Sequence, residues 1–116
     1  MRTIVFVFVF VLVGAGCGID LGPCPPDSAA LQKTGRQVVN NRCVECHGTR
    51  VLGEDRHEAP AAANWDDLGK VRRDAQAIYG DSTAGSMPPP VAGKARLAPE
   101  ELEAMRVWLA CGAQDL

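Results

Sequence analysis

Apolar residues are arranged in two different ways along the chain. An unbroken apolar run covers residues 4–12 after a positively charged start, and small residues then lead to Cys17. A charged start, a short apolar run and a small-residue exit are typical of a secretory signal. The run is too short for a membrane-spanning helix, which needs about 20 residues. We therefore assign residues 1–16 to a signal peptide, residues 17–27 to a tether and residues 28–116 to one small domain.

Within that domain, three stretches place apolar residues at helical spacing, and no stretch alternates in the way a half-buried strand does. The first predicted helix is capped by Asp27 or Ser28 and delivers residues 43–47 at its end. The second predicted helix covers residues 65–79, with Asn64 as its cap. Loops rich in Gly, Pro and charged residues separate these stretches.

The last predicted helix has the clearest start and the clearest apolar face. Pro99 suits its first position, and Glu100 and Glu101 suit the positive end of a helix dipole. Its apolar face consists of Leu102, Met105, Trp108 and Leu109. The three helices and the loops between them predict an all-α fold.

Composition adds a requirement that the helices alone do not meet. Removing residues 1–16 leaves 100 residues and changes the net charge from −2 to −3, because Arg2 is lost. No polybasic stretch remains, which argues against nucleic-acid binding. Leu, Ile and Val make up only 17 of the 100 residues, and no Phe is left. Such a chain hardly fills a core by itself, and a large apolar cofactor would fill it.

The sequence Cys43-Val44-Glu45-Cys46-His47 provides the attachment site for such a cofactor. C-x-x-C-H is the covalent haem attachment signature. Two thiols on one helical turn each add to one vinyl group, and the histidine beside them becomes the proximal ligand of the iron.

Other uses of these thiols fit less well. A thioredoxin-like dithiol needs a βαβ context that the chain lacks. A zinc site drawing on His57 lacks a second paired ligand motif. A simple disulfide between Cys43 and Cys46 leaves His47 unexplained.

The second axial ligand is predicted from the two methionines of the mature chain, because a thioether stabilises ferrous iron. Met105 lies on the apolar face of the last helix, and we assign it to the core. Met87 lies in a loop before three prolines, which hold a side chain with little loss of entropy. We predict Met87 as the distal ligand and His57, in a charged stretch, as a surface residue.

Two further residues are candidates for the surroundings of the haem. A proximal histidine usually donates its other ring N–H to a backbone carbonyl, and we predict the carbonyl of Pro60 as that acceptor. Trp65 either lies at the haem edge, where it packs or bonds a propionate, or belongs to the core, and the sequence leaves both open.

Three cysteines remain. Val13-Gly14-Ala15-Gly16-Cys17 resembles a bacterial lipobox, with Gly14 where Leu is usual, so we expect lipidation of Cys17; ordinary signal cleavage is the alternative. In an oxidising compartment Cys24 and Cys111 are expected to form a disulfide, and two separate thiols are the alternative.

Taken together, these residues resemble a class I cytochrome c, and more closely the small bacterial lipoprotein type. The resemblance covers about residues 28–110. It is carried by Gly35, the Cys43 to Gly48 motif, Ala59-Pro60, the Gly85-Ser86-Met87-Pro88-Pro89 loop and the Leu97 to Leu109 helix.

This resemblance implies three main helices and long loops wrapped round one covalently bound haem c, with His47 proximal and Met87 distal. It also implies that the first and last helices cross near a right angle, with Gly35 against Trp108. The chain departs from the family in Ala98, where Ser or Thr is usual, and in Val39, which replaces an aromatic residue.

The function expected from this sequence is single-electron transfer by an exported c-type cytochrome, not catalysis. We expect a monomer with transient redox partner proteins, a lipid anchor at Cys17 on the periplasmic side of a bacterial membrane, and no nucleic-acid partner. The alternatives are a haem-based sensor or peroxidase-like domain in which Met87 dissociates, and a zinc domain without redox function.

Overall fold

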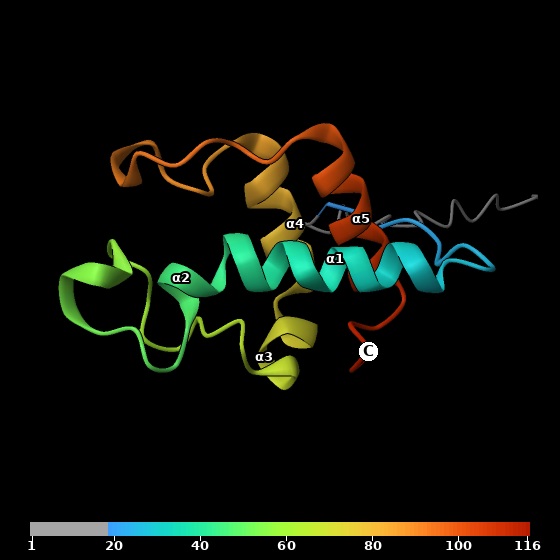
Figure 1. Cartoon of the computed structure of the whole chain (residues 1–116), viewed down its shortest axis with the longest axis horizontal. Coiled ribbons are helices and arrows are strands. Elements are labelled where there is room, and N and C mark those ends of the chain that lie inside the picture. The colour runs from blue at the N-terminus through green and yellow to red at the C-terminus, as the bar shows by residue number, and fades with distance from the viewer. Residues whose placement is uncertain (1–18) are drawn as a thin grey trace, which may run out of the picture.

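The computed structural model describes residues 19–116, which fold into helices joined by long loops (Figure 1). The helices are α1 (Ala29–Arg42), α2 (Val44–His47), α3 (Leu68–Arg73), α4 (Ala75–Ala84) and α5 (Pro99–Ala110). Two short 3-10 helices lie at Gly53–Arg56 and Pro90–Ala92. No strand occurs in residues 19–116, which confirms the all-α class. The predicted signal peptide and Cys17 lie outside the described residues.

The main packing in the fold is between α1 and α5, which cross steeply (Figure 1). Gly35 lies where the two helices meet. A Cβ atom at this position would overlap the carbonyl oxygen of Ala104 and would lie 2.8 Å from Cβ of Trp108. The expected contact of Gly35 with Trp108 is therefore present, and it explains a glycine inside a helix.

The core forms around this crossing. Its members are Val38, Val39, Val71, Ala75, Ile78, Leu97, Met105, Trp108, Leu109 and Ala113. Val39, at a position where the resemblance implies an aromatic residue, is completely buried, and Met105 is completely buried too. The indole N–H of Trp108 donates to the carbonyl of Gln114 over 2.9 Å, so this buried polar group is satisfied. Met105 is thus a core residue, as predicted.

The helix that carries the two motif cysteines is interrupted once. α1 ends at Arg42, and α2 continues after Cys43. The N–H of Cys43 still donates to the carbonyl of Val39, and the N–H of His47 donates to the carbonyl of Cys43. The predicted single helix up to residue 47 is therefore two helices. Cys43 links them, because its N–H bonds to α1 and its carbonyl accepts from α2.

The middle of the chain differs from the prediction of one helix over residues 65–79. The structure has α3 and α4 instead, separated at Asp74. The cap is Asp67, whose Oδ1 accepts from the backbone N–H of Gly69 over 2.9 Å. Asn64 is not a cap; it is buried, and its side chain donates to the carbonyl of Ala61.

The end of α4 also differs from the prediction, because residues 80–84 are helical and not part of a loop. Ile78 and Ser82 are buried on one face of this helix, and the hydroxyl of Ser82 donates to the carbonyl of Ile78. Burial of this face outweighs the cost of about 1 kcal/mol for Gly80 inside a helix. The helix ends at Gly85, which has a φ of 79°.

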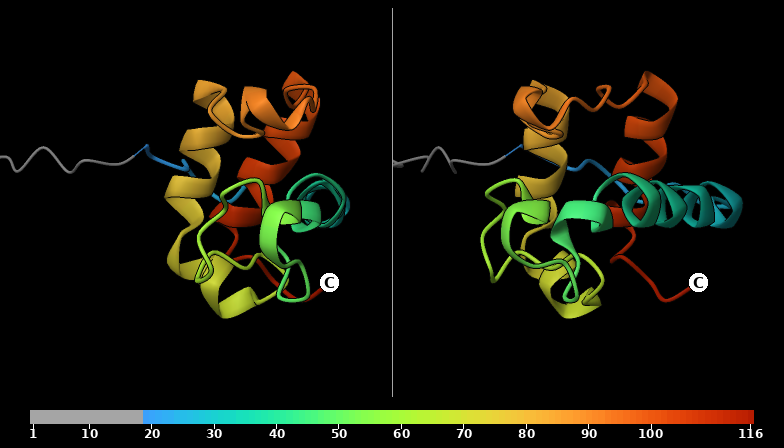
Figure 2. Two further views of the ribbon diagram at one scale, coloured as in Figure 1. Left: turned by 90° about the vertical axis from the view of Figure 1, so that its left-hand side faces the viewer. Right: turned by 60° about the vertical axis from the view of Figure 1, so that its left-hand side comes forward.

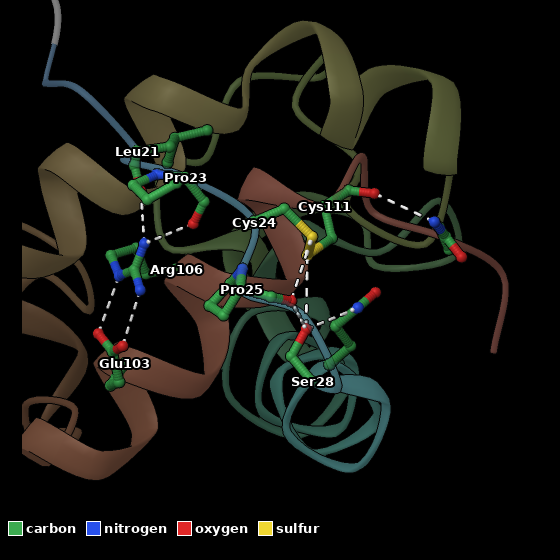
Figure 3. The surroundings of a disulfide bond; sticks show 10 residues. Leu21, Pro23, Cys24, Pro25, Ser28, Glu103, Arg106 and Cys111 are labelled. Carbon is green, nitrogen blue, oxygen red and sulfur yellow. Dashed lines mark hydrogen bonds and ion pairs between the residues drawn. A yellow bond between two sulfur atoms is a disulfide. The ribbon is translucent and has the colours of Figure 1, made fainter.

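The N-terminal segment, residues 19–27, is not helical and lies along α5 (Figure 3). Arg106 of α5 donates to the carbonyl of Leu21 over 2.7 Å and pairs with Glu103 on its own helix. Cys24 forms a disulfide with Cys111, just after α5. The segment predicted as part of a tether is thus held against the domain. None of the helices in residues 19–116 has the length and hydropathy of a membrane span.

Candidate functional site

The motif cysteines, the motif histidine and Met87 all line one cavity. In both views of Figure 2 the loop from α4 to α5 (orange) lies above α2 (green). Cys43, Cys46 and His47 line the cavity from the end of α1 and from α2, and Met87 lines it from the loop after α4. Residues about forty positions apart in the sequence therefore share one site.

The apolar walls of this cavity come from the core. Ile78 of α4 and Leu97 before α5 are both buried and both line it. Pro88 and Pro89 line it next to Met87. An apolar cavity with two thiols and a histidine at one wall fits a haem with two thioether links.

His47 is held in one orientation by a backbone carbonyl. The ring is buried, with 8% exposed, and Nδ1 lies 2.9 Å from the carbonyl oxygen of Ala63. Because a carbonyl only accepts, Nδ1 carries the proton and Nε2 is the nitrogen with a free lone pair. This is the tautomer that a histidine needs to bind iron through Nε2.

The prediction of Pro60 as the acceptor is wrong. Its carbonyl instead accepts from the backbone N–H of Ala63 over 2.9 Å and from the side chain of Arg56 over 2.8 Å. The chain turns between residues 60 and 63, so it is the carbonyl of Ala63, three residues later, that reaches His47. The sequence contains no signal for Ala63, because only its backbone oxygen makes the contact.

The protonation states at this wall agree with haem ligation. Burial lowers the pKa of His47, and the hydrogen bond to Ala63 partly opposes this effect. At neutral pH the imidazole is therefore neutral, which is the form that binds a metal. Burial raises the pKa of Cys43 to about 12, and burial with the nearby Glu45 raises the pKa of Cys46. Catalytic dithiols have lowered thiol pKa values, so these thiols do not resemble a thioredoxin site.

Trp65 lies against the histidine. Its ring stacks on the imidazole of His47 with centroids 5.2 Å apart and an interplanar angle of 21°. Its backbone N–H donates to the carbonyl of His47 over 2.7 Å. Trp65 is half-buried, packs on the core and also lines the cavity. Trp65 therefore belongs to both the core and the cavity wall, and its contact with the haem edge stays a prediction.

Met87 is held by the end of α4. The backbone N–H groups of Ser86 and Met87 both donate to the carbonyl of Asp81, over 3.0 Å and 3.1 Å. The prolines that follow restrict the chain on the other side of Met87. The side chain is half-buried and lines the cavity. His57, by contrast, is exposed in the loop after α2.

The family model for cytochrome c matches residues 32–110. The chain belongs to the cytochrome c family. No curated protein and no solved structure matched the chain. Cytochromes c bind covalent haem c with iron and typically transfer electrons, so this cytochrome is a haem c protein whose general role is electron transfer. The matched residues include both motif cysteines, His47 and Met87.

Proposed function

We propose that this cytochrome carries single electrons outside the cytoplasm through one haem c whose iron is bound by His47 and Met87. The observation that carries the proposal is the convergence of the Cys43 to His47 motif and Met87 on one apolar cavity. Bound there, haem iron accepts and releases one electron. An iron bound by both His47 and Met87 would keep no open position for a substrate.

Each residue has a defined task in this proposal. Cys43 and Cys46 form the two thioether bonds, and His47 binds iron through Nε2 while Nδ1 donates to Ala63. Met87 would supply the second protein ligand to the iron. Apolar walls exclude water from the site. With fixed ligands and no water, few groups have to rearrange when the iron gains or loses an electron.

The location and partners that we propose rest on the pattern of residues 1–17 and on the net charge. The signal-like residues 1–16 support export to the periplasmic side of a bacterial membrane, with a lipid anchor at Cys17. We propose that it acts as a monomer, and that redox partner proteins bind transiently through small interfaces. A mature net charge of −3 gives at most weak steering by basic surfaces, and nucleic acid is not a partner.

The optical spectrum of the chain, co-expressed with a cytochrome c maturation system, tests the ligands. Haem that stays with the protein after extraction with acidified acetone supports the thioethers at Cys43 and Cys46. The ferric form should be low-spin with a weak far-red charge-transfer band, and Met87→Ala should remove this band. Met105→Leu is the matched control, because Met105 is buried in the core; it should keep the band.

Other outcomes would contradict the proposal. A high-spin ferric spectrum of the unaltered protein would mean an open axial position and would favour the sensor or peroxidase-like function. A chain without haem would contradict both functions. Membrane fractionation tests the anchor separately: Cys17→Ser should move the cytochrome to the soluble fraction, and a cytochrome that stays membrane-bound would exclude a lipid at Cys17.

A further inference from the structure

Arg56 is the most heavily hydrogen-bonded side chain in the loop that follows α2. Its guanidinium donates to five backbone carbonyls: Gly48 over 2.9 Å, Val51 over 3.0 Å, Ala59 over 3.1 Å, Pro60 over 2.8 Å and Ala63 over 3.3 Å. No carboxylate pairs with it among residues 19–116, although Glu54, Asp55 and Glu58 are close in sequence. All hydrogen bonds of the guanidinium within the described residues are thus to backbone carbonyls.

These five carbonyls come from both ends of one loop. Gly48 and Val51 lie just after α2, whereas Ala59 to Ala63 lie just before Trp65. The only regular element between them is the 3-10 helix Gly53–Arg56. A loop with so few internal bonds is fixed mainly by side chains, and a rigid planar fork of donors is well suited to hold several carbonyls at once.

One of the five carbonyls is the partner of the haem ligand. The oxygen of Ala63 lies 2.9 Å from Nδ1 of His47 and 3.3 Å from a guanidinium nitrogen of Arg56. A carbonyl oxygen has two lone pairs, so it accepts from both groups. Arg56 and His47 therefore donate to the same carbonyl oxygen. Loss of the Arg56 side chain would free this oxygen to move relative to Nδ1 of His47.

We propose that Arg56 is a positioning residue for the proximal ligand: it fixes the loop so that the carbonyl of Ala63 faces Nδ1 of His47. This inference rests on the proposed function, in which His47 binds iron. The proximal hydrogen bond determines the orientation and basicity of a ligand histidine. Without Arg56, the carbonyl of Ala63 is no longer held, and the bond to His47 becomes longer and more variable.

The iron–histidine stretching band tests this proposal, because it reports the hydrogen bond at Nδ1 directly. The band is measured by resonance Raman on the ferrous Met87→Ala cytochrome, in which the distal ligand is removed. Arg56→Gln and Arg56→Lys should both move the band to lower frequency and broaden it. Lysine keeps the positive charge but lacks the planar set of N–H donors. An equal shift in the lysine and glutamine variants would therefore show that the donors of Arg56, and not its charge, position the loop.

Arg72 supplies the matched control. Its guanidinium donates to the carbonyls of Gly112 and Ala113 after α5, and it does not line the cavity. Arg72→Gln therefore removes a comparable side chain–backbone contact far in sequence from the ligand loop, and it should leave the band unchanged. An equal shift in Arg72→Gln would reduce the role of Arg56 to general stability and overturn the proposal.

A second measurement keeps the test independent of the Met87→Ala background. In the otherwise unaltered ferrous cytochrome, the Nδ1 proton of His47 should exchange with solvent about tenfold faster in both Arg56 variants, because its bond to the carbonyl of Ala63 is weakened; a tenfold change corresponds to about 1.4 kcal/mol. An unchanged band together with unchanged exchange would reject the role of Arg56 while leaving the ligands intact. A Met87→Ala parent without any iron–histidine band would instead contradict His47 ligation, and with it the proposed function.

Discussion

At position 35 the absence of a methyl group determines how closely two helices approach. A Cβ atom here would overlap the backbone oxygen of Ala104. This oxygen is part of helix α5, so it cannot move away without a shift of the helix backbone. The close approach allows Trp108 to be 1% exposed beneath α1. Two buried residues of the same core, Ile78 and Leu97, line the cavity.

Gly35→Ala should therefore destabilise the cytochrome by at least about 2–3 kcal/mol, because backbone has to shift to make room for the methyl group. Thermal unfolding measured by circular dichroism checks this value. Gly80→Ala in α4 is the control, since its Cβ would meet only the flexible side chain of Ile19 at 3.3 Å. It should be neutral or slightly stabilising, and equal losses in both variants would disprove the crossing argument.

Asp66 shows a pH-dependent contact at the residue scale. Burial alone would raise the pKa of Asp66, but hydrogen bonds from the backbone N–H and hydroxyl of Thr49, at 2.9 Å and 2.8 Å, outweigh it and lower the pKa. Because the pKa is lowered, the contribution of these hydrogen bonds to the free energy of unfolding is complete above the ordinary value of 3.8. This contribution is lost as the pH falls below that value.

Asp66→Asn should therefore lower the stability by less than about 1 kcal/mol at pH 7, because the carboxylate is exposed to solvent. The difference from the unaltered cytochrome should disappear on acidification below pH 3.8, in urea unfolding curves measured across this range. Thr49→Val should have a similar effect. A constant difference at all pH values would show that charge at Asp66 is not involved.

The residues that we propose to bind the cofactor have a signal in the sequence, whereas the residues that support them have none. Cys43, Cys46 and His47 carry a specific spacing, and Met87 is one of only two candidates. Ala63 acts through its backbone oxygen, which has no signature in its side chain. Arg56 lies in a charged stretch that looks like surface in the sequence, because only the fold turns its guanidinium inward to five carbonyls.

At the scale of the helices, prediction succeeds where local signals and packing agree. α5 begins at Pro99 and has the predicted apolar face, as expected from the sequence. The prediction of one helix over residues 65–79 fails at its start, because Asn64 is buried and Asp67 caps the helix instead. Gly80 suggests a helix end, but packing of the neighbouring turns overrides its low helix propensity.

The start of α5 is only half capped. The carboxylate of Glu101 accepts from the backbone N–H of Ala98 over 2.8 Å, which is one of the two bonds of a capping box. The reciprocal bond is absent at this position, because alanine has no side-chain acceptor for the N–H of Glu101. This explains how the helix tolerates an unfavourable residue at its cap.

Ala98→Ser should complete the box and stabilise the cytochrome by about 1 kcal/mol. For a domain of this size, the midpoint of thermal unfolding should rise by about 4–8 °C. Ala98→Val, which is similar in size to Thr but lacks the hydroxyl, is the control and should give no increase. If serine and valine have the same effect, the serine does not act through a hydrogen bond.

At the scale of the whole molecule, the two ends of the domain are held together on one side (Figure 3). The disulfide joins the N-terminal segment to the end of α5 across 87 residues of sequence. Arg106 adds bonds from α5 to the carbonyls of Leu21 and Pro23. Because Cys17 lies only a few residues before this segment, a lipid at Cys17 would hold the domain close to the membrane.

Removing this disulfide should therefore cost more stability than any local change. In the chain-entropy model, a loop of 87 residues corresponds to about 4–5 kcal/mol, as an upper value. Cys24→Ser with Cys111→Ser should lower the free energy of unfolding in guanidinium by a large part of this amount. The haem spectrum should be unchanged, since neither cysteine lines the cavity.

Arg106→Ala, which removes the other link but leaves the disulfide, should cost only about 1–2 kcal/mol. If Arg106→Ala costs as much as the double variant, the segment is held by local contacts and not by the covalent closure of the chain.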